Sequence, residues 1–69
     1  MPRHRPSYEA KIEVVAATEQ ALLCDFDGEE HWIPKSLLGD DADIDKSSSV
    51  GDTGEISIPE WFAIQEGII

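Results

Sequence analysis

The chain has 69 residues and carries 15 acidic side chains against five lysines and arginines, a formal charge of −10 at pH 7. Two of the five bases, Arg3 and Arg5, precede residue 8, so residues 9–69 hold 15 acids against three lysines, a charge of −12. A surface of this sign repels phosphate backbones and attracts basic protein surfaces. Direct binding of nucleic acid is therefore disfavoured, and a chain of this length is expected to form one domain with a small core.

The single cysteine, Cys24, excludes an intramolecular disulfide and fits a reducing compartment, where we expect it to be a small buried hydrophobe. No apolar stretch follows the basic start, and nowhere do about 18 apolar residues run together. Neither a secretory signal nor a membrane span is expected. We expect a soluble, cytoplasmic protein.

Residues 1–7 contain two prolines and three basic or titratable side chains, which predicts a flexible basic tail. From Tyr8 to Ala16 apolar and charged residues alternate with the period of two that is typical of a half-buried strand. The alternation resumes over residues 21–26, which predicts a second strand. Residues 8–69 are thus expected to form a single small β-rich domain.

Asp27 and Gly28 form a strong hairpin signal, because a two-residue turn of the primed type needs positive φ angles. The third strand should run over residues 29–33 and end at Pro34, which lacks an N–H. Residues 35–38 predict about one helical turn. Residues 39–52 hold five aspartates and little apolar surface, so we expect a mobile acidic loop there.

Residues 54–58 predict a fourth strand, and Pro59 takes a favoured first position of a short C-terminal helix. Trp61 and Ile64 recur at helical spacing and should pack across the sheet. The fold class is therefore mainly β (α+β), with about four strands and a short C-terminal helix. Two architectures fit, a small curled antiparallel sheet or an open barrel of the SH3-like or OB-like kind.

Little in the chain indicates catalysis or a bound metal, and we expect a non-enzymatic protein without a cofactor. Asp41, Asp43, Asp45 and Asp52 match the positions 1, 3, 5 and 12 of an EF-hand loop, but Lys46 stands where such a loop needs glycine. A solvated charged loop explains these residues better. The histidines are expected at the surface, because zinc requires three or four nitrogen or sulfur donors.

The aromatic residues favour protein contacts over nucleic acid, because stacking on bases also requires a basic groove. Trp32 and Trp61 are expected in the core. Phe62 follows Trp61 and so lies on a different helical face, which makes Phe62 the candidate for an exposed partner contact. With Ile68 and Ile69 it would form an apolar patch typical of protein–protein sites.

Three segments resemble a family of short proteins from phages and prophages: residues 18–23, with the motif T-E-x-A-x-L, residues 31–36, with W-I-P-K-S, and residues 58–69, with I-P-x-W-x-A. No activity is established for that family. The resemblance implies a virus-encoded, cytoplasmic accessory protein. Phe62, where the family has an aliphatic residue, and the long acidic loop are departures from its pattern.

These observations predict a non-enzymatic binding protein of a phage or mobile element whose acidic surface blocks a basic or nucleic-acid-binding site of a host protein, as an anti-CRISPR inhibitor acting by DNA mimicry would. The expected contacts are eight carboxylates near the hairpin and in the loop: Asp25, Asp27, Glu29, Glu30, Asp40, Asp41, Asp43 and Asp45. One alternative is a module of phage DNA metabolism that binds single-stranded nucleic acid or a replication enzyme through its barrel face and the basic tail Arg3-His4-Arg5. The other is a self-associating structural protein, such as a homodimer.

Overall fold

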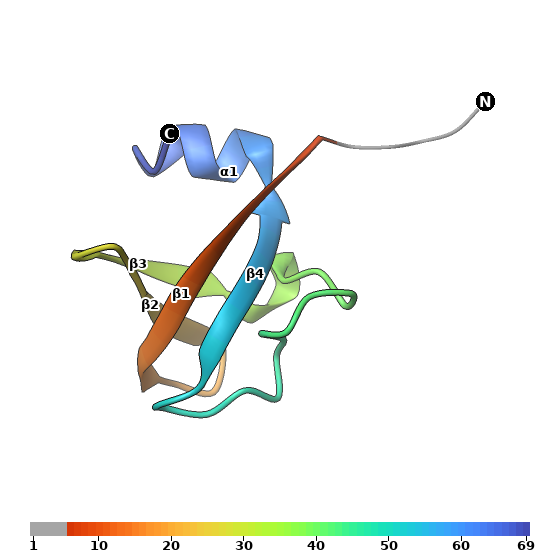
Figure 1. The fold of residues 1–69 in the computed structure, drawn as a ribbon. Helices are drawn as coiled ribbons and strands as arrows, with labels where there is room; N and C mark the ends of the chain where they lie inside the picture. Colours follow the sequence, from red (N-terminus) through yellow and green to blue (C-terminus); the bar gives the residue numbers. More distant parts are fainter. Residues whose placement is uncertain (1–5) are drawn as a thin grey trace.

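Four antiparallel strands form one sheet in the order β3-β2-β1-β4, so the two end strands do not pair and the sheet does not close into a barrel (Figure 1). The computed structural model describes residues 6–69. The strands are β1 (Ser7–Ala17), β2 (Ala21–Phe26), β3 (Glu29–Pro34) and β4 (Thr53–Pro59); a 3₁₀ turn, η1 (Lys35–Leu37), follows β3, and a short helix, α1 (Glu60–Gln65), follows β4. The predicted mainly β fold with a short C-terminal helix is confirmed. Most of the predicted basic tail, residues 1–5, lies outside the described residues.

The long strand β1 changes neighbours along its length. Its first part pairs with β4 from Ser7↔Pro59 to Glu13↔Thr53, and its last part pairs with β2 from Glu13↔Asp25 to Ala17↔Leu22. The register shifts between Val14 and Ala16, where a bulge bends the strand. The first part of β1 therefore has a strand on one side only.

The predicted hairpin turn between β2 and β3 is confirmed by its backbone angles. Asp27 has a φ of 57° and Gly28 a φ of 96°, as a two-residue turn with two positive φ angles requires. The Asp25 carboxylate closes the turn, since its Oδ1 accepts a hydrogen bond from the Gly28 N–H at 2.7 Å.

The core lies on the inner face of the sheet, under α1. Alternate strand residues supply most of it, and α1 and the loop supply the rest; its buried members are Ile12, Val14, Leu22, Cys24, Ile33, Ile44, Ile56, Ile58, Phe62 and Ala63. Cys24 is fully buried, as its residue type predicts, and burial raises the pKa of its thiol to about 11.

The acidic loop between η1 and β4 is more closely packed than its composition predicts. Ile44 is only 1% exposed. The N–H groups of Gly39 and Ile44 donate to the carbonyls of Ser57 and Glu55, at 2.9 and 3.0 Å. The loop thus lies along the outer edge of β4 and covers backbone groups that would otherwise be open to pairing with another chain.

Helix α1 presents a different face to the core than predicted. Phe62 and Ala63 are buried, whereas Trp61 and Ile64 are 51% and 59% exposed. The expectation that Phe62 is an exposed contact is wrong, and so is the expectation that Trp61 packs in the core. Residues 61–64 are all apolar, so they surround the helix and periodicity cannot choose the buried face.

Candidate functional site

The eight predicted contact carboxylates fall into two groups on different sides of the molecule. In Figure 1 the β2–β3 hairpin tip, which carries one group, projects at the left, and the 39–52 loop, which carries the other, lies at the right. Sheet order explains the separation, because β3 and β4 are the two opposite edges. A partner therefore meets the two groups as separate surfaces.

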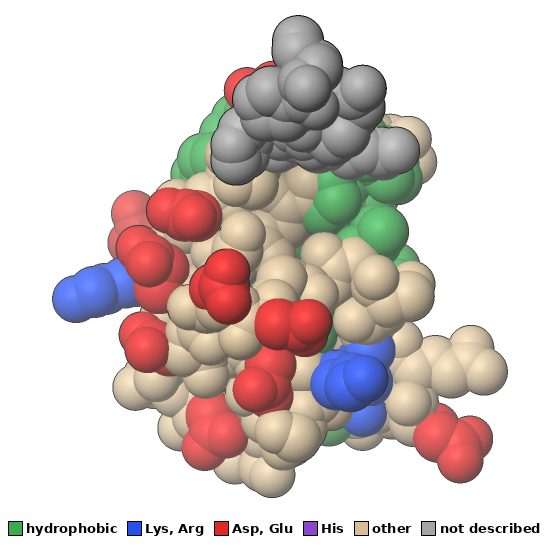
Figure 2. All heavy atoms as spheres, turned by 90° about the vertical axis from the view of Figure 1, so that its right-hand side faces the viewer, with side chains coloured by type: hydrophobic (Ala, Val, Ile, Leu, Met, Phe, Trp, Pro, Cys, Tyr) green, Lys and Arg blue, Asp and Glu red, His purple; other side chains and the backbone are tan. Residues whose placement is uncertain are grey.

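The group on the loop side combines residues from three parts of the chain. A shallow hollow of about 200 Å³ is lined by Glu9 of β1, Glu55 of β4, and Asp40 and Asp41 of the loop. Asp43 joins them, since its Oδ2 accepts a hydrogen bond from the Glu55 N–H at 3.1 Å. We call these five residues the loop face. Figure 2, which looks at this side, shows it covered by many acidic and few basic side chains.

Two strand residues of the loop face, Glu9 and Glu55, were not among the predicted contacts. The alternation of each strand placed them on its outer side. Their proximity depends on the register of β1 against β4, in which Glu9 lies opposite Ser57 and Lys11 opposite Glu55. That register joins distant parts of the chain and has no local sequence signal.

The Asp45 carboxylate makes hydrogen bonds within the loop. Its Oδ1 accepts hydrogen bonds from the Ser47 hydroxyl at 2.6 Å and from the Ser47 N–H at 2.9 Å. These bonds hold the pKa of the Asp45 carboxyl below its usual value, because they favour the charged form. Asp52 likewise accepts from the Ser49 N–H at 2.8 Å. Within residues 6–69 no three carboxylate, histidine or cysteine side chains come together as a metal site would require.

The four predicted contact carboxylates near the hairpin tip have different roles in the structure. Asp25 holds the turn. Asp27 and Glu29 line a groove of about 580 Å³ between the tip and β1. Glu30 is exposed and lies opposite Asp25 in the β2–β3 register.

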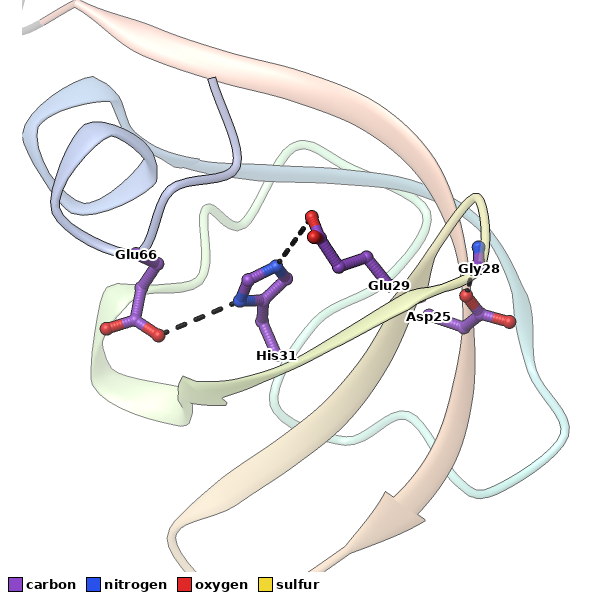
Figure 3. A network of polar contacts seen from close by, with 5 residues as sticks. All are labelled: Asp25, Gly28, Glu29, His31 and Glu66. Carbon is purple, nitrogen blue, oxygen red and sulfur yellow. Dashed lines mark hydrogen bonds and ion pairs between the residues drawn. The ribbon is translucent and has the colours of Figure 1, made fainter.

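His31 connects the hairpin to the segment after α1 (Figure 3). Its Nε2 lies 3.3 Å from Glu29 Oε1, and its Nδ1 lies 3.8 Å from Glu66 Oε1. The ring also meets Phe26 edge to face, with 5.6 Å between centroids. The side chain is only 13% exposed, so the prediction of a surface histidine is wrong. Because Glu66 stands just before the last residues of the chain, the contact helps to place Ile68 beside the hairpin.

The exposed aromatic residues are the two tryptophans. Trp32 is 47% exposed because β3 turns its neighbour Ile33 inward, so the prediction that Trp32 lies in the core is wrong. Trp61 stands edge to face on Phe62, with 5.8 Å between centroids. Phe62 is therefore buried beneath Trp61, and Trp61, not Phe62, is the aromatic side chain that α1 exposes to a partner.

Comparisons of the chain with protein-family models, curated proteins and solved structures found no match. The resemblance to short phage proteins stays a prediction. No helix within residues 6–69 has the length and apolar character needed to cross a bilayer.

Proposed function

We propose that this chain is a non-enzymatic binding protein whose loop face occupies a basic, nucleic-acid-binding site on another protein. The supporting observation is the concentration of five carboxylates on the loop face; Lys11 lies opposite Glu55 in the β1–β4 register but forms no ion pair with it. Glu9, Asp40, Asp41, Asp43 and Glu55 are all exposed, and among residues 6–69 the only ion-pair contacts involve His31. Uncompensated charge of this kind raises the rate of encounter with basic surfaces and favours pairing with lysine and arginine.

Backbone bonds and Ile44 hold this charge in place, so a partner need not order the loop on binding. Preorganisation of this kind reduces the entropic cost of association. The motif resemblance implies that the protein acts in the cytoplasm of a bacterial host. In its most specific form, the proposal is that the protein inhibits a host defence complex.

The test is affinity capture from nuclease-treated bacterial lysate, with wild-type protein and the variant D40K/D41K compared at low and high salt. We expect the wild type to retain a nucleic-acid-handling protein that high salt releases, because the screening length between exposed charges falls from about 10 Å at 0.1 M salt to about 3 Å at 1 M. The variant should retain much less. The captured protein is then purified, and its nucleic-acid binding is measured with and without the chain. Equal capture by both proteins, or no competition with nucleic acid, would reject the proposal.

A second candidate is self-association through α1, which the exposure of its apolar side chains favours. Trp61 and Ile64 of α1, and Ile69 beyond its end, are each more than half exposed. Sedimentation across a dilution series, with W61S/I64S as the comparison, tests this function. A mass that stays at one chain throughout would exclude it.

A further inference from the structure

The groove at the hairpin tip runs beside a stretch of β1 that has no neighbouring strand. Its volume is about 580 Å³, and its walls come from β1, the β2–β3 turn and the C-terminal segment: Tyr8, Ala10, Lys11, Phe26, Asp27, Gly28, Glu29 and Ile68. It is therefore bounded by backbone as well as by side chains.

The hydrogen bonds between Val14 and the residues just before β4 show to which side each N–H and carbonyl group of β1 points. The Val14 N–H donates to the Asp52 carbonyl at 2.9 Å, and the Val14 carbonyl accepts from the Gly51 N–H at 2.7 Å. Successive residues of a strand turn these groups to opposite sides. Even-numbered residues in this part of β1 thus face β4, and odd-numbered residues face the β2 side.

On the β2 side, pairing begins only at Glu13↔Asp25, because β2 ends at Phe26 and the chain turns away at Asp27. The N–H and carbonyl groups of Glu9 and Lys11 therefore lie on the edge of β1 that is directed to the β2 side, where Lys11 lines the groove, and have no strand partner there among residues 6–69. Two donors and two acceptors at strand spacing form an edge to which an extended peptide can add.

The side chains around this edge indicate which peptide fits. Tyr8, Phe26 and Ile68 supply apolar and aromatic walls, and Asp27 and Glu29 place two carboxylates at the rim. Lys11 is the one basic residue of the lining, and the described residues as a whole carry 15 acids against three lysines. Charge complementarity selects a segment that alternates basic and apolar side chains.

We propose that this groove binds an extended basic segment of a partner protein as an added β-strand, with main-chain hydrogen bonds to Glu9 and Lys11 and a lysine or arginine against Asp27 and Glu29. The basic character of the partner rests on the proposed function. The groove and the hollow of the loop face have no lining residue in common, but Glu9 belongs to the loop face through its side chain and to the edge of β1 beside the groove through its main chain.

The test uses the full chain, ¹⁵N-labelled and observed by NMR, and the blocked peptide Ac-Arg-Val-Arg-Val-Arg-Val-NH₂. We expect saturable shifts of the amides of Glu9, Lys11, Asp27 and Glu29. A peptide that is N-methylated at alternate residues keeps its charge but loses strand pairing, so it should bind about tenfold more weakly, as expected for the loss of one or two hydrogen bonds.

Two neutralised variants with the same change in charge provide the control. D27N/E29Q should weaken peptide binding about fivefold, the effect of a rim charge pair, and D40N/D41N should leave it nearly unchanged. Equal binding of the N-methylated peptide, or shifts confined to Asp40, Asp41, Asp43 and Glu55, would overturn the proposal. So would concentration-dependent shifts of the groove residues without peptide that vanish when residues 1–5 are deleted, because the occupant would then be the basic start of a second copy. If the chain does not bind the peptide but still captures a partner through the loop face in a salt-sensitive way, the groove proposal is rejected and the proposed function is retained.

Discussion

At the scale of single residues, Ile44 has the largest influence on the acidic surface. It is the one large aliphatic side chain that residues 39–49 contribute to the core, and the aspartates around it remain in solvent. Its burial positions the charged residues on both sides of it.

We expect Ile44→Ala to lower the free energy of unfolding by about 2–5 kcal/mol, the range for a buried isoleucine truncated to alanine. Urea unfolding followed by tryptophan fluorescence measures the change. The matched control is Val50→Ala in the same loop, where the side chain is 59% exposed and the change should stay below about 0.5 kcal/mol. Similar small losses for both variants would show that the loop does not pack through Ile44.

Cys24 provides a pH-dependent prediction. Burial raises the pKa of its thiol from 9.0 to about 11 in the folded chain, so the folded state holds its proton more tightly than the unfolded state. Its contribution to stability is complete below pH 9 and is lost as the pH rises towards 11. Unfolding free energies at pH 8 and pH 10.5 should therefore differ more for the wild type than for Cys24→Ala. An identical pH dependence of the two proteins would contradict this.

Single-residue burial could be predicted from the sequence only where a strand constrained it. Alternation correctly placed Cys24, Ile56 and Ile58 inside. Alternation could not predict which face of α1 is buried, because the four apolar residues at 61–64 point in all directions around a helix of only six residues. Ile44 was missed because it stands alone among polar neighbours, and only the path of the loop along β4 brings it to the core.

At the scale of elements, the edge of β4 depends on a close approach of the loop. A Cβ added at Gly54, which has a φ of 154°, would lie 2.6 Å from the Cβ of Asp43. The loop cannot keep its hydrogen bonds to β4 and accommodate a methyl group at this point.

Gly54→Ala should therefore destabilise the chain more than Gly28→Ala. At Gly28 an added Cβ meets nothing within 4 Å, so only its positive φ opposes the change, a cost of about 1–2 kcal/mol. At Gly54 the steric overlap adds about 1–3 kcal/mol. Thermal unfolding of the two variants side by side checks the order, and the reverse order would show that the loop moves away from β4 without cost.

The elements themselves were largely predictable from local signals. Period-two alternation predicted the first, second and fourth strands, and Asp27-Gly28 together with Pro34 predicted the hairpin and the third strand. The pairing of β1 with β4 was not predictable, because it joins the two ends of the domain and depends on which edge of β1 the hairpin leaves free. Both candidate surfaces depend on that pairing, which is why the loop and hairpin carboxylates were predicted as contacts whereas Glu9, Glu55 and the free edge of β1 were not.

At the scale of the whole molecule, mutual repulsion of the carboxylates opposes folding. The formal charge of −10 is large for 69 residues, and a compact state brings like charges closer together.

We expect the melting temperature at pH 7 to rise by about 4 °C or more between 10 mM and 500 mM NaCl, which corresponds to about 1 kcal/mol for a domain of this size. The variant D40K/D41K changes the formal charge to −6, since each substitution adds two units, and should respond less. A melting temperature that falls with salt in both proteins would show that specific ion pairs, and not net repulsion, dominate.

The main-chain attachment of the loop to β4 determines which loop positions can vary as the sequence evolves. Main-chain bonds from Gly39 and Ile44 to β4 do not depend on the identity of the neighbouring side chains. Asp40 and Asp41 lie between these two attachment points and are exposed. Substitutions at these two positions can therefore change the charge of the surface without disturbing the fold, while Ile44 and Gly54 stay fixed.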